Sequence, residues 1–196
     1  MLPLTFYGLR FMSKQSRLKR ESFRTAWQGS SWRLRVETVI LPDGSTLERG
    51  VVEHPGSVVM VPLRHSSSDL EVLMLRQYRH VVDEVVLELP AGTRGWDEDW
   101  LACAQRELRE EAGYRAQTLI PLGEIWPAPG ISTEVMALYL ATELSLDPLA
   151  ADLDEELEVQ PMPLAELIAM AQDGRLQDAK STVGILRAAV YLNYNL

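Results

Sequence analysis

The sequence predicts a mixed α/β (α+β) fold, and the order of its apolar patterns carries that prediction. Short stretches with the alternation or the compact apolar runs of β-strands recur along residues 32–89 and again along 117–144. A helical segment, Asp99–Ala112, separates these two groups, and two more helical segments end the chain. Strands grouped before and after a helix, with further helices at the end, are typical of the α+β class.

Length and composition are those of a globular protein. The 196 residues contain 46% hydrophobic and 24% charged side chains. No apolar run approaches the roughly 18 residues that a membrane helix needs, and basic residues interrupt the N-terminal apolar pieces, so neither a membrane span nor a signal peptide is expected. Cys103 is the single cysteine and cannot form an internal disulfide. We therefore expect a cytoplasmic protein.

The charge balance bears on the partners. A net charge of -9 argues against general nucleic-acid binding, which needs a basic face. Residues 1–50 nevertheless hold nine Lys and Arg against four Asp and Glu. We interpret this basic part as a solvated segment or a surface that meets an acidic partner subunit. Because an acidic enzyme needs a cation between itself and an anionic substrate, the composition also favours a divalent metal.

The N-terminal part, residues 1–55, is expected to be an arm followed by a β-hairpin. A short helix is assigned within residues 13–27. Trp32–Val39 alternates apolar and polar side chains, and Asp43-Gly44 supplies the positive φ of a hairpin turn. A second strand, residues 46–54, is expected to return along the first.

Residues 56–196 are expected to form the main domain. Its predicted strands are Ser57–Leu63, Leu70–Arg76, Val85–Leu89, Gln117–Glu124, Val135–Leu144 and Leu157–Gln160. Two helices, Pro163–Gln172 and Asp178–Tyr191, finish the chain and are separated by Asp173-Gly174.

The helical segment Asp99–Ala112 carries three carboxylates on one face. It contains neither Pro nor Gly, and Gly113 is a natural C-terminal stop. Glu107, Glu110 and Glu111 stand at i, i+3 and i+4, so their side chains share a face. Three carboxylates within one turn repel one another unless a cation neutralises them, and hard oxygen ligands suit Mg²⁺ or Mn²⁺.

A wider pattern decides between a metal site and a solvated acidic helix whose glutamates pair with Arg106 and Arg109. Gly92 is followed after five residues by Glu98, and seven residues later the chain reads Arg-Glu-Leu-Arg-Glu-Glu-Ala-Gly-Tyr from Arg106. This arrangement resembles the signature box of the Nudix hydrolases at every fixed position. The resemblance implies a mixed β-sheet sandwiched by helices, and hydrolysis of a diphosphate linked to another moiety by attack of water on phosphorus.

The resemblance also implies roles for individual residues. The implied metal ligands, for Mg²⁺ or Mn²⁺, are Glu107 and Glu111, with Glu110 close behind, and the main-chain carbonyl of Ala91. Glu98 and Arg106 are implied to orient these carboxylates. Metals bound there would neutralise the diphosphate, polarise phosphorus and lower the pKa of a bound water.

Motifs that flank the box resemble the ADP-ribose pyrophosphatase branch of the family. They are His54–Val59, Arg76–Arg79, Glu88–Gly92, Pro129–Glu134, Asp173-Gly174 and Asp178–Lys180. In that branch the N-terminal strands take part in a dimer, and substrate pockets draw residues from both subunits. The resemblance implies that Arg79 and Glu134 contact the substrate; for Arg79, a surface ion pair is the alternative. Trp32 is a candidate for stacking on adenine, and its competing interpretation is a core or interface tryptophan.

The same branch uses a glutamate on a late loop to activate the attacking water. Asp154–Val159 resembles that loop, and we favour Glu155 as the base, followed by Glu156; a solvated acidic loop is the alternative. Cys103 lies four residues before Glu107 and is expected to be a small packed residue; a thiol that binds soft metals or is oxidised near the site is the alternative.

These observations predict a Mg²⁺-dependent homodimeric hydrolase that converts ADP-ribose to AMP and ribose 5-phosphate. A GDP-mannose or UDP-sugar pyrophosphatase is the alternative within the same class, since relatives share these flanking motifs. A non-catalytic nucleotide-binding regulatory module is the alternative from another class. RNA binding or decapping through the basic N-terminal part is a further alternative.

Overall fold

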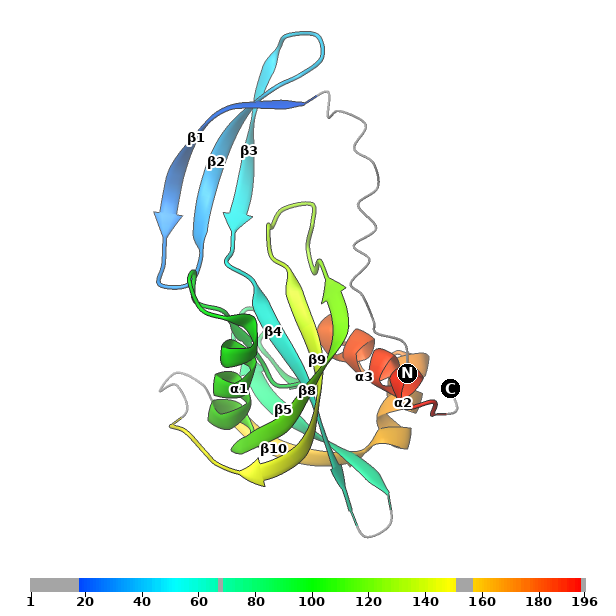
Figure 1. The fold of residues 1–196 in the computed structure, drawn as a ribbon. Coiled ribbons are helices and arrows are strands. Elements are labelled where there is room, and N and C mark those ends of the chain that lie inside the picture. The colour runs from blue at the N-terminus through cyan, green and yellow to red at the C-terminus, as the bar shows by residue number, and fades with distance from the viewer. Residues whose placement is uncertain (1–17, 67–68, 151–156, 195–196) are drawn as a thin grey trace. The chain divides into compact units, whose positions relative to one another are not determined.

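The computed structural model describes residues 18–66, 69–150 and 157–194 (Figure 1). These residues divide into two compact units. Of the described residues, those up to His54 and residues 128–133 form the first unit, and those within 55–127 and from Glu134 onward form the second. Among the residues that the structure describes, no helix combines the length and the apolar character needed to cross a membrane.

The first unit is a three-stranded antiparallel sheet with the order β1-β2-β3 (Figure 1). Its strands are β1 (Lys19–Gln28), β2 (Arg33–Ile40) and β3 (Thr46–Glu53). The predicted hairpin is therefore confirmed, and its turn contains Gly44 at φ 84°. Residues 128–133 extend the unit, because the Val52 N–H donates to the Ile131 carbonyl (2.8 Å) and the Thr133 N–H donates to the Val52 carbonyl (2.9 Å).

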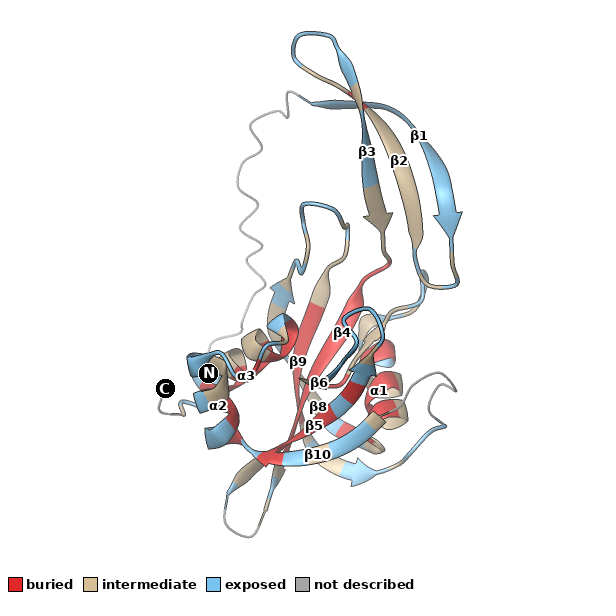
Figure 2. Ribbon diagram, turned by 180° about the vertical axis from the view of Figure 1, so that it is seen from behind, coloured by how far each residue is buried: buried red, intermediate tan, exposed pale blue. Residues whose placement is uncertain are grey.

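The helix expected within residues 13–27 is wrong where the structure describes that segment, because β1 occupies Lys19–Gln28. The strand pairs with β2 from Lys19 opposite Ile40 to Gln28 opposite Arg33. Every residue of β1 is exposed (Figure 2), so no buried face imposes the apolar alternation by which a strand is recognised in a sequence. Inter-strand pairing rather than burial determines this element.

The second unit is built on a seven-stranded mixed sheet with the order β10-β5-β4-β9-β8; in addition, β6 pairs with β5 and β7 with β4. The strands are β4 (Ser57–His65), β5 (Leu70–Arg79), β6 (Glu84–Glu88), β7 (Ala91–Thr93), β8 (Tyr114–Ile125), β9 (Met136–Leu146) and β10 (Leu157–Pro163). β4 and β9 are parallel, and the other pairs are antiparallel. The predicted mixed sheet is confirmed, with β7 as a short addition.

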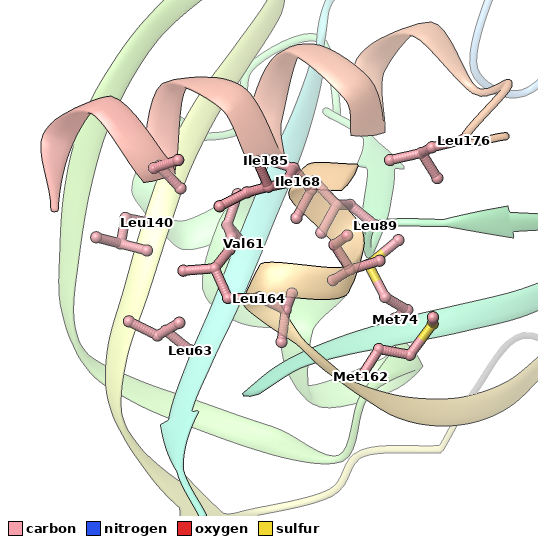
Figure 3. Packing of buried hydrophobic residues seen from close by; sticks show 14 of the residues in the cluster. Val61, Leu63, Met74, Leu89, Leu140, Met162, Leu164, Ile168, Leu176 and Ile185 are labelled. Atoms are coloured by element: carbon pink, nitrogen blue, oxygen red, sulfur yellow. The ribbon is translucent and has the colours of Figure 1, made fainter. Parts of the chain in front are cut away.

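Helices cover both faces of this sheet, as expected (Figure 1). α1 (Trp100–Glu111) lies on one face, and α2 (Leu164–Asp173) and α3 (Ala179–Tyr191) lie on the other. β4 belongs to both interfaces: Val58 and Met60 pack in the cluster that contains α1 residues, and Val59 and Val61 pack in the cluster that contains α2 and α3 residues. Successive side chains of a strand point to opposite faces, so β4 is buried almost throughout (Figure 2). Figure 3 shows Val61 and Leu63 of β4 within the cluster that contains α2 and α3 residues.

The caps of α1 account for its limits. The Asp99 Oδ1 atom accepts hydrogen bonds from the N–H groups of Leu101 (3.0 Å) and Ala102 (3.1 Å), which satisfies two donors at the start of the helix. Gly113 follows the C-terminal end at φ 78°, a conformation that favours glycine. The predicted helix Asp99–Ala112 is thus confirmed, and β8 begins immediately after it.

Candidate active site

Two box glutamates are buried where α1 faces β7. Glu107 and Glu111 are 9% and 5% exposed, and the Ala91 N–H donates to Glu111 Oε2 at 2.7 Å. A Cβ atom at Gly92 would lie 1.8 Å from Glu107 Cδ, so any larger residue here would displace this carboxylate. The local packing explains why glycine stands at this position.

Arg106 connects three carboxylates of the box. Its Nε and Nη2 atoms donate to Glu98 at 2.9 and 3.0 Å, and its Nη1 donates to Glu107 at 2.7 Å and to Glu110 at 2.9 Å. The hydrogen bonds from Arg106 lower the pKa of Glu98 to about 2, although partial burial acts in the opposite direction. Glu98 also accepts from the Gly95 N–H (2.9 Å), so it ties the box loop to the helix.

Arg94 fastens the box loop to the start of β4. Its Nε and Nη2 donate to the Pro55 carbonyl at 3.1 and 2.9 Å, and its Nη1 donates to the Glu98 carbonyl at 2.5 Å. The guanidinium lies 4.6 Å from the ring centroid of Trp100, the first residue of α1. These contacts explain how the loop is held between β7 and α1.

The chemistry of this donor set fits a hard divalent cation. Glu98, Glu107 and Glu110 share the guanidinium of Arg106, so these three carboxylates carry more negative charge than Arg106 offsets. Among the described residues, no three Asp, Glu, His or Cys side chains already surround a common point. In this arrangement Arg106 Nη1 binds both Glu107 and Glu110, whereas Glu111 accepts a hydrogen bond from the Ala91 N–H.

A cavity of about 260 Å³ lies beside β7 in the second unit. Its lining includes Ser57, Arg79, Ala91, Glu134, Asp178 and Lys180. Three residues selected from the sequence, Arg79, Ala91 and Glu134, therefore meet in one cavity. Glu111 adjoins it through its hydrogen bond with the Ala91 N–H.

The polar walls of the cavity are held by short hydrogen bonds. Glu134 Oε1 accepts from the Ser57 hydroxyl at 2.6 Å. Arg79 donates from Nε and Nη2 to the two carboxylate oxygens of Glu88, both at 2.7 Å. The hydrogen bond to Glu88 raises the pKa of Arg79 despite its partial burial, so the guanidinium stays charged.

The remaining predicted site residues are Trp32 and the two candidates for the base, Glu155 and Glu156. Trp32 belongs to the first unit, where it is 38% exposed and its ring centroid lies 4.5 Å from that of Trp27. Its exposure disfavours a core role, and stacking on adenine stays a prediction. Glu155 and Glu156 lie outside the described residues.

Cys103 is a buried, packed residue, as expected. Burial, together with the nearby charges of Glu98 and Glu107, raises the pKa of its thiol to about 12. The thiol therefore stays protonated at neutral pH, and a reactive or metal-binding thiolate is disfavoured.

Sequence reasoning assigned no role to Glu88 or Lys180, although both stand in motifs that it singled out. Lys180 lines the cavity and donates to Glu88. The signal for Glu88 is a charged residue inside the apolar stretch Val85–Leu89, which a buried ionic contact explains. Nothing local pointed to Lys180 as its partner, because the two residues are 92 positions apart.

Comparison with known proteins assigns the family. The sequence model of the NUDIX domain matches residues 53–183, which include all of α1 and every residue named above as lining the cavity. The chain belongs to the Nudix family. Its Nudix box is the segment Gly92–Tyr114. The box begins at Gly92 of β7, which lies close to the Glu107 carboxylate, and ends at Tyr114, the first residue of β8.

Relatives and a solved structure extend the comparison. This Nudix protein is 32% identical over 161 residues to a methanol dehydrogenase activator from Bacillus methanolicus, covering 81% of this chain and 85% of the relative. It is 32% identical over 154 residues to an ADP-ribose pyrophosphatase from Bacillus subtilis (strain 168), covering 78% and 82%. A crystal structure of an ADP compounds hydrolase matches with a TM-score of 0.75 at 20% identity, covering 90% of this chain and 95% of that chain, and shares the fold.

Proposed function

We propose that the protein is a divalent-metal-dependent pyrophosphohydrolase that cleaves ADP-ribose into AMP and ribose 5-phosphate. The main observation behind this proposal is that the glutamate face of α1 lies directly beside the cavity. Ala91 lines the cavity, and its N–H holds Glu111 of the Nudix box. The similarity to the ADP-ribose pyrophosphatase supports the choice of substrate.

In this proposal the box supplies the metal site. Glu107, Glu111 and Glu110, with the Ala91 carbonyl, would hold Mg²⁺, or Mn²⁺ in its place, because both prefer oxygen ligands. A bound cation would neutralise the diphosphate and lower the pKa of a coordinated water. Arg106 and Glu98 would set the orientation of the ligating carboxylates, as their hydrogen bonds suggest.

The cavity would orient the substrate. The guanidinium of Arg79 is a planar cation suited to phosphate oxygens, and Glu134 can accept hydrogen bonds from ribose or base. In the reaction, the oxygen of water bonds to one phosphorus, and the bond between the bridging oxygen and that phosphorus breaks. Glu155, or Glu156 in its place, would take the proton of the water.

The first unit would serve as the dimerisation element of a cytoplasmic homodimer. In the described part of this unit, three aromatic side chains are more than a third exposed: Phe23, Trp27 and Trp32. Exposed aromatic residues on one small sheet are typical of a surface that another protein covers. Trp32 would then reach adenine across the dimer or pack in its interface.

A substrate comparison tests the proposed function. With Mg²⁺, ADP-ribose is expected to have a kcat/KM above those of GDP-mannose and UDP-glucose, and a chelator should abolish turnover of all three. Glu111→Gln is the matched inactive control, with a loss of at least a hundredfold because one metal-binding carboxylate charge is removed. Faster turnover of either sugar nucleotide than of ADP-ribose would contradict the substrate assignment, and full activity of E111Q would contradict the metal site.

A further inference from the structure

Glu88, at the end of β6, is a buried carboxylate that binds two cations. It is 3% exposed. Arg79 approaches it with two parallel hydrogen bonds of 2.7 Å, and the Lys180 ammonium donates to its Oε2 atom. Burial alone would raise the pKa of Glu88, but the hydrogen bonds and charges of Arg79 and Lys180 outweigh burial and lower it. The carboxylate is therefore ionised at neutral pH.

Lys180 reaches Glu88 because α3 packs closely on the sheet. A Cβ atom at Gly184 would lie 2.6 Å from Leu89 Cδ1, so a larger residue at this crossing would displace the Leu89 side chain. One turn earlier, the Ser181 hydroxyl accepts from the Leu89 N–H at 2.7 Å. These contacts place the first turn of α3 beside the end of β6, and Lys180 beside Glu88.

Both cations line the cavity and keep donors beyond those that Glu88 uses. A guanidinium has five N–H donors, and Arg79 Nη1 makes no hydrogen bond with any residue that the structure describes. The ammonium of Lys180 has three N–H donors, of which one goes to Glu88 and one to Asp178 Oδ2 at 3.0 Å. Two neighbouring cations with donors to spare are suited to a phosphate group.

The N-terminus of α3 also lies at this wall of the cavity, but it is less suited to binding an anion than the side chains of Arg79 and Lys180 are. Asp178 caps that helix and accepts from the Ser181 N–H at 3.1 Å as well as from its hydroxyl. A carboxylate therefore already occupies the position where a helix terminus would receive an anion. The attraction for phosphate falls to the side chains of Arg79 and Lys180.

We propose that Lys180 binds a phosphate of the substrate together with Arg79, and that Glu88 is the positioning residue that holds both cations at the cavity wall. This inference rests on the proposed function, because it names the residues that receive the diphosphate. Glu88 acts only through the two cations and does not itself contact the substrate.

The test compares Lys180→Met, Lys180→Arg and Glu88→Gln with the wild type. Steady-state kinetics on ADP-ribose with saturating Mg²⁺ should show an increase of at least tenfold in KM for K180M and E88Q, and substantial recovery in K180R. The double variant E88Q/K180M should lose less than the product of the two single effects, because Glu88 acts partly through Lys180. Circular dichroism and thermal unfolding establish that each variant is folded at the assay temperature.

A binding measurement separates this inference from the substrate assignment. Calorimetric titration with inorganic pyrophosphate in the presence of Mg²⁺ should show a Kd at least tenfold weaker for K180M than for the wild type. Arg175→Met is the matched control, because it removes the same charge from an exposed pair with Asp173, and it should bind as the wild type does. Equal affinity of K180M and wild type, or no binding by the wild type, would overturn the role of Lys180, whichever nucleotide sugar is hydrolysed. If E88Q is folded and leaves both KM and Kd within twofold of the wild type, Glu88 has no positioning role.

Discussion

At the scale of single residues, the site depends on how closely backbone and carboxylates approach one another. Gly92 presses β7 against Glu107, and the Ala91 N–H holds Glu111. Arg106 spreads one guanidinium over three carboxylates. The positions of the glutamate carboxylates are therefore set by contacts that a single methyl group or a single charge would alter.

Gly92→Ala is expected to damage the site and the fold together. The new Cβ would lie 1.8 Å from Glu107 Cδ, so that carboxylate must move. We expect a loss of about 1–3 kcal/mol in the free energy of unfolding, typical of overpacking, and a fall in kcat/KM of at least tenfold. Denaturant unfolding and kinetics measure both. Gly50→Ala is the control, because a Cβ atom at Gly50 would have no neighbour within 4 Å; equal effects of the two substitutions would contradict the close-approach explanation.

Glu98→Gln is expected to reduce the loss of thermal stability that occurs as the pH falls into the acidic range. The pKa of Glu98 is about 2 in the folded protein and about 4.5 for an unperturbed glutamate. A group whose pKa is lowered by folding stabilises the protein above the unfolded value, so its contribution is lost as the pH falls from about 4.5 to about 2. The Tm difference between wild type and E98Q should accordingly be largest near neutral pH and shrink below pH 4.5.

The comparison is made in metal-free buffer, so that cation binding does not contribute. Asp97→Asn is the control on the same loop, where the carboxylate is exposed. A Tm difference for E98Q that stays constant between about pH 6 and pH 2.5 would contradict the effect of Arg106 on Glu98.

At the scale of elements, the first unit is unusual because every residue of its edge strand, β1, is exposed. Phe23 is 56% exposed on β1, with the guanidiniums of Arg20 and Arg35 at 5.7 and 5.1 Å from its ring centroid. β1 nevertheless pairs with β2 over nearly its whole length. An ordered strand with exposed aromatic side chains is typical of an interface.

Phe23→Glu is therefore expected to weaken the proposed dimer. Light scattering coupled to size exclusion should give the mass of a dimer for the wild type and of a monomer, or a faster exchange, for F23E. Val82→Glu introduces the same carboxylate at an exposed apolar residue of the second unit and should leave the mass unchanged. A monomeric wild type would contradict dimerisation through β1.

At the scale of the whole molecule, the candidate site collects residues that are far apart in the chain. β5 contributes Arg79, β7 contributes Ala91 and Gly92, and the start of α3 contributes Lys180. The mixed sheet brings them together because β4 pairs with β5, β7 and β9. α1 packs on one face of this sheet, and this packing places Glu107 of α1 next to Gly92 of β7.

Much of this fold was predictable where burial leaves a periodic pattern. The strands and helices of the second unit were recognised because their apolar side chains face a core on one or both sides. β1 was misassigned because an exposed strand leaves no such pattern. β7 was missed because three residues are too few to show one.

The sequence by itself determined the glutamate face and the chemistry that it suggests. Helical geometry places Glu107, Glu110 and Glu111 on one side of α1 wherever that helix lies, so spacing alone was sufficient. Only the tertiary structure decided which residues share the cavity with Arg79, and that Glu88 joins Arg79 to Lys180. The reason is physical: a helix repeats over a few residues, whereas an ion pair across 92 positions depends on how strands pair and how α3 packs.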